Sequence, residues 1–357
     1  MNNREPLGVA IWGAGWVAGA HARAYLLAAQ ALAAGGPGQT GEAEGARTPA
    51  VRLVAIGSRR ETSARELAAR LDLQDVRYYT DYERLLADPD VAVVSICTPN
   101  GRHAQEAIAG AQARKHLLIE KPVATTPEDF KAVLAAVERA GVTAASCFIQ
   151  RWNPLVSALR TMREQGDFGR IFLARADYWF GRERPGWMRD ADLAGSSFLV
   201  GAIHAVDSIR YVLGADVVEV DARGLSVGDY YHYPPVAMAL VRFSNGAIGT
   251  ISSSLVGHTG YVLNLELVGT EGSARNHQVY VRRIPGLQGW ITLPVPGPAS
   301  GDVSQLPFPQ LVEDFIRAIR AGLVPKANLP SVVNTHEVCF AVDQSIESGK
   351  PVALPLG

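Results

Sequence analysis

The stretch "LGVAIWGAGWVAGAHARAY", residues 7–25, decides the fold of the first part of the chain. A mostly apolar run predicts a buried strand, and a helix should follow it. Between the two, Gly13, Gly15 and Ala18 fit G-x-G-x-x-G/A, in which the first glycine permits a tight turn and the second lets a pyrophosphate approach the backbone. The helix N-terminus adds amide donors for phosphate. The stretch therefore predicts a dinucleotide-binding turn, although glycine-rich turns also serve packing alone.

The rest of the first part, as far as about residue 149, continues to alternate short apolar runs with amphipathic ones. Helices are expected at residues 61–71 and 126–141. Such alternation predicts an α/β fold with a doubly wound parallel sheet, whose ligands bind at the carboxyl ends of the strands. The expected strands are residues 7–12, 51–57, 76–79, 91–98, 116–120 and 142–149.

The end of the second strand bears on the choice of cofactor. A loop rich in Gly, Pro and Ala, residues 33–49, separates it from the first helix, so the usual spacing to a ribose-binding acid does not apply. In "VAIGSRRETS" the strand ends at Ser58, Arg59 and Arg60, where an NAD enzyme usually has Asp or Glu. A hydroxyl and guanidinium groups suit a 2'-phosphate, which favours NADP over NAD. Alternatively, the two arginines only begin a solvated helix.

The second half of the chain is rich in strands. Strand-like runs occupy residues 170–181, 217–226, 236–257 and 261–283, with a hairpin turn expected at residues 244–246. A final helix is expected at about residues 332–347. With 357 residues, two domains are the prior expectation.

Composition excludes several functional classes. Hydrophobic residues make up 48% and charged residues 19% of the chain, as in an ordinary globular protein, and the net charge of -1 with dispersed basic residues argues against a nucleic-acid partner. Cys97, Cys147 and Cys339 are far apart and lack metal-ligand spacing, which favours a reducing cytoplasm without a bound metal. Because neither a signal-peptide pattern nor an apolar run of membrane-spanning length is visible, no membrane association is expected.

Five motifs together resemble the Gfo/Idh/MocA family of oxidoreductases, the relatives of glucose-fructose oxidoreductase and inositol dehydrogenase. In order along the chain they are "GAGWVAGAH" (13–21), "CTPNGRHAQEA" (97–107), "IEKPVATT" (119–126), "GAIHAVDSIRYVLG" (201–214) and "ELVGTEGSAR" (266–275). One such match could be accidental, whereas five in this order indicate the family.

The resemblance implies a fold of two domains and an activity. A Rossmann domain (1–125) and a connecting helix and strand (126–150) should precede an α/β domain (151–331) for substrate binding and oligomerisation, built on a large, open, mostly antiparallel sheet. The helix at about 332–347 should pack back near the Rossmann domain. The implied protein is a homodimer or homotetramer that transfers hydride between NADP or NAD and a secondary alcohol or ketone of a sugar, cyclitol or sugar derivative.

In "LLIEKPVAT" the resemblance makes Lys121 a catalytic candidate. A lysine at the carboxyl end of a central strand points toward the crevice where nicotinamide should lie, and its ammonium can stabilise the alkoxide that develops as hydride leaves. Pro122 fixes the following backbone, with a cis peptide bond implied, and Glu120 orients the lysine or contacts the nicotinamide ribose. The alternative is a surface Glu-Lys pair at a strand end.

His204 is the second catalytic candidate. The run "GSSFLVGAIHAVDSIRYVLG" reads as a helix that presents His204 and Asp207 on one face. In the family this histidine is the general acid/base, which suits a group that titrates near neutrality. Inositol dehydrogenases carry an aspartate four residues before it, where this chain has Val200. An orienting acid is thus missing, which puts polyol specificity in doubt, and Asp207 either replaces it or is structural.

The remaining candidates come from strand ends, loops and the resemblance. "TPN" is equally a good turn and helix cap, and the aromatic residues could be core or an oligomer contact, although aromatic faces with arginines suit a sugar ring or an anionic substituent. The expected cofactor-binding residues are Gly13, Gly15, Trp16, Val17, Ser58, Arg59, Arg60, Thr98, Pro99, Asn100, His103, Glu120 and Lys121. The expected substrate-binding residues are Gln150, Arg151, Asn153, Trp179, Arg182, Trp187 and His204.

Two other functions fit the same fold. A bound NAD could transiently oxidise a sugar to permit glycoside cleavage, or the protein could be a non-catalytic sensor of nucleotides. The presence of both Lys121 and His204 favours the dehydrogenase.

Overall fold

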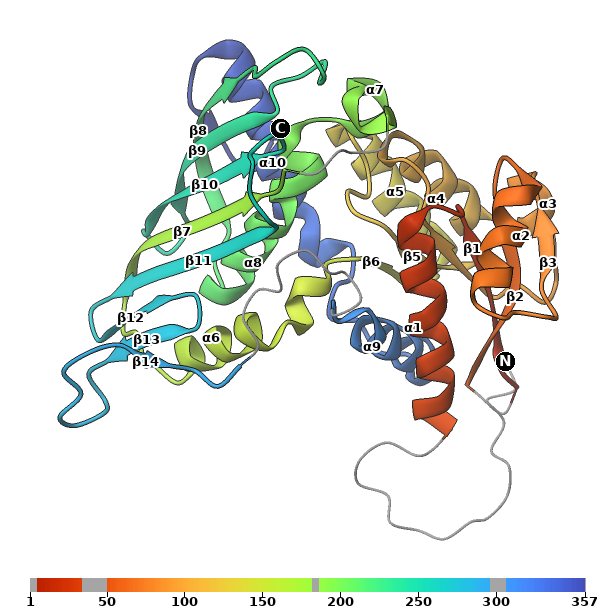
Figure 1. Cartoon of the computed structure of the whole chain (residues 1–357), viewed down its shortest axis with the longest axis horizontal. Helices are drawn as coiled ribbons and strands as arrows, with labels where there is room; N and C mark the ends of the chain where they lie inside the picture. The colour runs from red at the N-terminus through yellow and green to blue at the C-terminus, as the bar shows by residue number, and fades with distance from the viewer. Residues whose placement is uncertain (1–4, 34–49, 182–185, 296–305, 357) are drawn as a thin grey trace, which may run out of the picture. The chain divides into compact units, whose positions relative to one another are not determined.

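A computed structural model describes residues 5–33, 50–181, 186–295 and 306–356 (Figure 1). The predicted insertion at 33–49 lies almost entirely outside these ranges, and so does Arg182. The chain divides into two compact units. Unit 1 comprises Met1–Ala124, Glu128–Cys147 and Pro307–Pro330, and unit 2 comprises Thr125–Pro127, Phe148–Leu306 and Ser331–Gly357.

Unit 1 is built on a parallel sheet, which has six strands in the described part of the chain. β1 pairs with β2 on one side and with β4 on the other, so the strand order reverses at β1, and this is where doubly wound sheets bind ligands. The prediction of a doubly wound Rossmann sheet is therefore confirmed. In sheet order the strands are β3 (Arg77–Tyr79), β2 (Val51–Gly57), β1 (Leu7–Trp12), β4 (Val93–Ile96), β5 (His116–Ile119) and β6 (Ala144–Ser146).

The central strands of this sheet are buried because helices cover them. Every residue of β1 and β4 is buried, as expected for parallel strands covered on both faces. The segment Pro307–Pro330 also belongs here: its helix packs on α1, and Ser146 donates its backbone N–H to Ala327 O at 2.9 Å. The helices are α1 (Trp16–Ala33), α2 (Glu61–Arg70), α3 (Tyr82–Leu86), η1 (Asn100–Arg102), α4 (His103–Gln112), α5 (Pro127–Ala140) and α9 (Phe308–Ala321).

Unit 2 is built on a mixed, mostly antiparallel sheet, which has nine strands among the described residues (Figure 1). Two neighbours, β7 and β10, run parallel. The predicted hairpin turn is confirmed between β9 and β10, where Gly246 has a φ of +85° that suits glycine. In sheet order the strands are β14 (Ile291–Thr292), β13 (Gln278–Val281), β12 (Gly272–Arg275), β11 (Val262–Gly269), β7 (Ile171–Trp179), β10 (Ile248–Ser254), β9 (Val236–Phe243), β8 (Val217–Leu225) and β15 (Val352–Ala353).

Helices cover one face of the second sheet. Helix α8 packs on β7, and α10 packs on β8 and α8, where Ala222 N donates to Ser345 Oγ at 2.9 Å. Because α10 is part of unit 2, its position relative to unit 1 stays a prediction. The helical elements are η2 (Ile149–Trp152), α6 (Pro154–Glu164), η3 (Gly186–Arg189), α7 (Ala191–Ala194), the π-helical turn η4 (Phe198–Ala202), α8 (Ile203–Leu213), η6 (Pro330–Val332) and α10 (Val333–Ser348).

The described ranges contain no helix that is both long enough and apolar enough to pass through a bilayer.

Candidate active site

The turn between β1 and α1 has the shape that a dinucleotide requires. Gly13 has a φ of +111°, and a Cβ there would lie 2.5 Å from Cys97 O, so the fold itself requires this glycine. A Cβ at Gly15 would meet no heavy atom within 4 Å, so packing does not require Gly15. Its bare backbone lies just before Trp16 and Val17, the first residues of α1, and Trp16 is 65% exposed. An open backbone at a helix N-terminus fits a pyrophosphate.

The end of β4 is held by a carboxylate that was not identified from the sequence. Thr98 Oγ1 donates to Glu106 Oε2 at 2.5 Å, and Trp12 Nε1 donates to Glu106 Oε1 at 2.8 Å. Burial raises the pKa of Glu106, while these two hydrogen bonds oppose the rise. Pro99 precedes the short helix η1, in which Asn100 is buried. Glu106 thus joins the ends of β1 and β4 at the switch point of the sheet.

His103 fastens two loops at the same sheet edge. Its Nδ1 lies 2.6 Å from Pro122 O and its Nε2 lies 2.7 Å from Thr98 O. With either tautomer the ring donates to one of these carbonyls, and a doubly protonated ring donates to both. His103 was expected to bind cofactor, and the structure gives it the further role of joining the segments that follow β4 and β5.

The end of β2 carries the residues expected to recognise a 2'-phosphate. Ser58 is half-buried, and its N–H donates to Tyr79 O at 2.9 Å, whereas Arg59 and Arg60 are exposed. The next acid, Glu61, forms an ion pair with Arg65 at 2.6 Å. No carboxylate occupies the position just after β2, in agreement with the sequence.

Glu120 and Lys121 follow β5 directly. Glu120 is only 8% exposed, and its Oε2 accepts the backbone N–H of Lys121 at 3.2 Å. Lys121 is half-buried, and the predicted cis peptide bond between Lys121 and Pro122 is confirmed. Because β5 lies next to β4, Lys121 stands one strand away from the switch point.

A buried group of polar residues lies under Glu120. His21 Nε2 is 2.8 Å from Glu120 Oε1 and 3.6 Å from Cys147 Sγ, and the three ligand atoms lie within 4.8 Å of one another. Ligand atoms on one tetrahedral metal are about 3.3 Å or more apart, given bond lengths of about 2.0–2.3 Å. The distance between His21 and Glu120 is therefore that of a hydrogen bond, and the geometry does not fit a metal centre.

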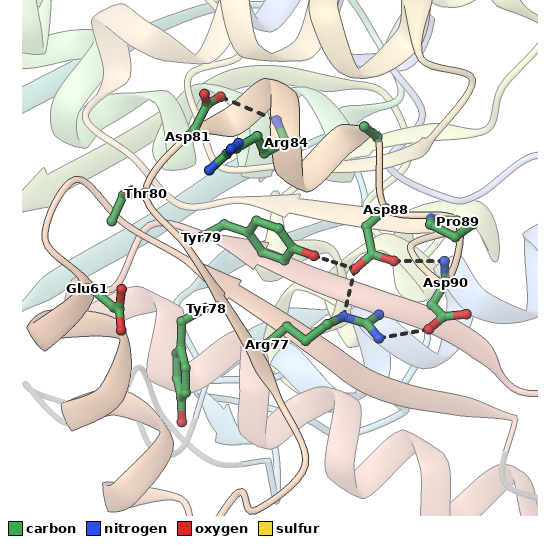
Figure 2. A pocket seen from close by; sticks show the side chains of 11 residues that line it. Glu61, Arg77, Tyr78, Tyr79, Thr80, Asp81, Arg84, Asp88, Pro89 and Asp90 are labelled. Atoms are coloured by element: carbon green, nitrogen blue, oxygen red, sulfur yellow. Dashed lines mark hydrogen bonds and ion pairs between the residues drawn. The ribbon is translucent and has the colours of Figure 1, made fainter.

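A hollow of about 640 Å³ lies along the edge strand β3 of the same unit (Figure 2). Arg77 forms ion pairs with Asp88 and Asp90, each at 2.8 Å, and Tyr79 OH donates to Asp88 Oδ2 at 2.8 Å. These contacts tie β3 to the loop before β4 and place charges on a sheet edge that would otherwise be open to pairing. None of the residues that line the hollow was expected to bind cofactor or substrate.

In unit 2, His204 lies in the second turn of a helix that starts irregularly. The predicted single helix at 195–214 is instead the π-helical turn η4 followed by α8, and Val200 lies within η4. Such turns are frequent at functional sites. His204 is 6% exposed, with its ring 5.6 Å from that of Tyr178 and 6.2 Å from that of Phe148.

Asp207 has a buried arginine as its partner. It forms a bidentate ion pair with Arg151, in which Nε donates to Oδ2 at 2.9 Å and Nη2 donates to Oδ1 at 2.6 Å. Thr335 Oγ1 also donates to Asp207 at 3.1 Å, and both charged side chains are buried. Arg151, expected to bind substrate, thus has a buried carboxylate as its partner, and the pair joins η2 to α8.

A series of hydrogen bonds leads from Asn153 and Gln150, which were predicted to bind substrate, to the aromatic residues near His204. Asn153 donates through Nδ2 to Gln150 Oε1 at 3.0 Å, and Gln150 Nε2 donates to Tyr261 OH at 3.2 Å. The Tyr261 ring is 5.2 Å from that of Tyr178, which neighbours His204. Burial raises the pKa of Tyr261 well above its ordinary value. Neither Tyr178 nor Tyr261 was predicted from the sequence.

The structure separates Trp179 from this group. Trp179 Nε1 donates to Ser252 Oγ at 2.7 Å, and Ser252 is paired in register with Asp177. Successive strand residues alternate between faces, so Asp177 and Trp179 lie on the face opposite to Tyr178. Trp187 is half-buried in η3, and Arg182 lies outside the described ranges.

Fold and site together define an oxidoreductase with a Rossmann nucleotide-binding unit. A family model described as "Oxidoreductase family, NAD-binding Rossmann fold" matches residues 7–148, and the "GFO/IDH/MocA C-terminal domain" matches residues 156–275. The "Uncharacterized oxidoreductase YrbE" of Bacillus subtilis is 32% identical over 64% of this chain and 67% of its own length. The chain belongs to the GFO/IDH/MocA oxidoreductase family.

Two further similarities extend over most of the chain. The scyllo-inositol 2-dehydrogenase (NAD(+)) of Bacillus subtilis is 26% identical over 86% of this chain and 90% of its own. The structure of a levoglucosan dehydrogenase in complex with NADH and levoglucosan is 26% identical, with a TM-score of 0.84 over 99% of this chain and 100% of the other. Both relatives are named dehydrogenases, and the similar structure was solved with NADH.

Proposed function

We propose that the protein is an NAD(P)-dependent dehydrogenase that transfers hydride between nicotinamide and a secondary alcohol or ketone of a sugar, cyclitol or sugar derivative. One observation carries this proposal: Lys121 is fixed at the carboxyl end of β5, one strand from the switch point of the sheet. The relatives named for inositol and levoglucosan support the substrate class.

The bare backbone at Gly15 and the N-terminus of α1 would hold the pyrophosphate, with Gly13, Trp16 and Val17 completing the turn. The segment of Thr98, Pro99, Asn100 and His103 would line the cofactor beyond it, and Glu120 the nicotinamide ribose. Bound nicotinamide supplies the acceptor or donor of hydride.

The acid/base roles belong to Lys121 and His204. The Lys121 ammonium binds the reacting oxygen and stabilises negative charge on it, while His204 takes up or returns the proton. Because Asp207 is bound to Arg151, the proton transfer is assigned to His204 itself. Gln150, Asn153, Tyr178 and Tyr261 would contact the other hydroxyl groups of the substrate.

The experiment that tests this function is a screen of sugars and cyclitols with NADP and NAD separately, in which absorbance of the reduced nicotinamide is followed. We expect turnover with at least one polyol, and a loss of at least about 100-fold in kcat for Lys121→Ala and for His204→Ala. NADPH binding without turnover on any substrate would indicate a nucleotide sensor. Glycoside cleavage without net change in absorbance would indicate redox-assisted hydrolysis.

We further propose a preference for NADP. A 2'-phosphate would contact the Ser58 hydroxyl and the guanidinium groups of Arg59 and Arg60, and no acid stands directly after β2 to repel it. Replacing Ser58 by Asp should shift the ratio of kcat/KM values toward NAD, since the carboxylate accepts from a ribose diol and repels phosphate. An unchanged ratio would show that the end of β2 does not select the cofactor.

We also propose that the protein works in a reducing cytoplasm as a homodimer or homotetramer. All three cysteines are buried and free. The open face of the second sheet, defined here as Leu173, Met238, Leu240 and Ile248 with their neighbours in register, carries exposed apolar side chains that suit an interface between copies.

A further inference from the structure

Beneath the sheet end that carries Lys121 lies His21, a fully buried histidine of α1 to which the proposed chemistry gives no role. Its Nδ1 is 2.7 Å from Ser95 Oγ on β4, and its Nε2 is 2.8 Å from Glu120 Oε1. The other oxygen of Glu120 accepts the backbone N–H of Lys121 at 3.2 Å. Hydrogen bonds thus lead from the sheet through His21 to the backbone of Lys121.

The charges of this group favour the ionised pair. Burial alone raises the pKa of Glu120, but the hydrogen bond and charge of His21, with weaker effects of Lys121 and His103, bring that pKa below its ordinary value. Burial alone lowers the pKa of His21, but the sulfurs of Cys97 and Cys147 outweigh it and raise that pKa well above its ordinary value. The Glu120 carboxylate lies 2.8 Å from the same ring. Both shifts favour an imidazolium hydrogen-bonded to a carboxylate.

We propose that His21 is a positioning residue for Lys121: it holds Glu120 as a carboxylate, and Glu120 fixes the backbone amide from which the lysine side chain extends. The inference rests on the proposed function, in which Lys121 is catalytic. On the other side of the lysine, His103 lies 2.6 Å from Pro122 O. The Lys121–Pro122 segment is therefore held on one side by His21, acting through Glu120, and on the other side by His103. The two histidines belong to different helices.

When His21 is replaced, the protonation of Glu120 depends on the other groups that face it. The groups that face Glu120 are His21 on α1, His103 on α4, Cys147 after β6 and the adjacent Lys121. Burial raises the pKa of the Cys147 thiol to about 12, so the thiol is neutral near pH 7 and does not replace the imidazolium. Without His21, burial favours a protonated Glu120 near neutral pH. A neutral carboxyl is a weaker acceptor for the Lys121 amide, and the lysine is then held less firmly.

The test compares His21→Leu, His21→Gln and Glu120→Gln with Ser146→Ala, a matched control that removes a buried hydroxyl from the neighbouring strand β6. We expect kcat to fall about 10- to 100-fold in His21→Leu and Glu120→Gln, because small displacements of a catalytic group cost up to about 100-fold in rate. His21→Gln keeps a donor for Glu120 and should recover part of the loss. Ser146→Ala should behave as wild type, and the NADPH dissociation constant should change little in the two His21 variants.

The pH profile of kcat separates positioning from packing. In His21→Leu, a new inflection should appear above the ordinary pKa of a glutamate, with kcat rising as Glu120 loses its proton. In the double variant with Glu120→Gln, that inflection should be absent. Packing damage alone lowers thermal stability and kcat without a new inflection. If His21→Leu does not fold, the kcat values of Glu120→Gln and His21→Gln test the proposal.

The proposal is overturned if Glu120→Gln keeps the wild-type kcat, or if His21→Leu folds and keeps both the wild-type kcat and pH profile. Failure of the proposed function is a different result: Lys121→Ala would then retain turnover. An inactive Lys121→Ala beside a fully active His21→Leu would refute the role of His21 alone.

Discussion

At the scale of single residues, Asp207 shows how a side chain predicted near the chemistry can have a partner that the sequence does not reveal. Its carboxylate forms two hydrogen bonds to Arg151 and one to Thr335, so few acceptor sites remain for His204. The sequence places Asp207 three residues after His204 but does not reveal a partner 56 positions away. A helical spacing identifies a shared face, whereas the tertiary partner depends on how η2 meets α8.

Asp207→Asn should destabilise the protein strongly. The variant keeps the shape of the side chain but leaves the Arg151 guanidinium buried without a counter-charge, which costs about 3–5 kcal/mol of unfolding free energy. Urea denaturation measures this difference. Glu164→Ala is the control, because it removes two ion pairs, with Arg160 and Arg163, whose side chains are all partly exposed, and it should cost less than about 1 kcal/mol. Equal effects of the two substitutions would contradict the structural role of Asp207.

Asp343 on α10 should make stability depend on pH. Burial raises its pKa to about 7, with a hydrogen bond from Ser196 opposing the rise. A raised pKa means that the folded state prefers the protonated acid, so this contribution to stability is complete below the ordinary pKa of 3.8 and is lost as the pH rises to about 7. Asp343→Asn should therefore be more stable than wild type at pH 8, by about 1–3 kcal/mol.

The difference between Asp343→Asn and wild type should shrink as the pH falls from about 8 to about 5, which urea unfolding at several pH values would reveal. Glu347→Gln, an exposed position on the same helix, serves as control and should change stability by less than about 0.5 kcal/mol at every pH. A constant difference between Asp343→Asn and wild type over this range would show that Asp343 is ionised throughout.

At the scale of elements, the turn between β1 and α1 contains two glycines that have different roles. Gly13 has a left-handed φ and touches the backbone after β4, whereas Gly15 faces open space. The first glycine serves the fold, and the second keeps a surface free for a ligand. The pattern G-x-G alone does not separate these roles, because the difference depends on the neighbouring strand.

Gly13→Ala and Gly15→Ala should therefore have different effects. In Gly13→Ala the Cβ would clash with Cys97 O at 2.5 Å, so both the melting temperature and NADPH binding should fall. Gly15→Ala should keep the melting temperature of the free protein but weaken NADPH binding at least about 10-fold, since the methyl group occupies the approach of the pyrophosphate. Calorimetric titration with NADPH and thermal unfolding measure the two quantities. Unchanged NADPH binding in Gly15→Ala would place the cofactor elsewhere.

The sequence predicted the strands and helices more accurately than the contacts between side chains. Apolar runs and helical periodicity located the six strands described in unit 1, because parallel strands covered on both faces are continuously apolar. In β7, Trp179 was predicted to bind substrate and Tyr178 was not, and it is Tyr178 that neighbours His204. Strand alternation indicates that these two residues face opposite sides, but which side carries helix α8 is a tertiary fact. The π-helical start of this helix and the contacts of Glu106 and Tyr261 likewise depend on distant segments.

At the scale of the whole molecule, the helices in the described parts of the chain leave one face of the second sheet uncovered. Register places Leu173 beside Ile248, and places Leu240 and Met238 on the next strand of the same face. These side chains are 44–55% exposed, while alternate residues of β9 face the helices and are buried. Charged residues between them, such as Arg175 and Arg242, separate the apolar side chains. A broad, twisted and partly apolar sheet face of this kind suits symmetric pairing with a second copy.

Leu240→Glu should disrupt this assembly. The substitution places a carboxylate on the open face, where pairing would bury it against apolar side chains of the second copy without a partner, which is costly. Light scattering coupled to size-exclusion chromatography should give a dimer or tetramer for wild type and a smaller species for Leu240→Glu, with the monomer melting normally. Val324→Glu is the matched control, because Val324 is a 77% exposed apolar residue of unit 1 and its replacement should leave the assembly unchanged. A monomeric wild type, or a Leu240→Glu variant that assembles as wild type does, would show that the open face serves another purpose.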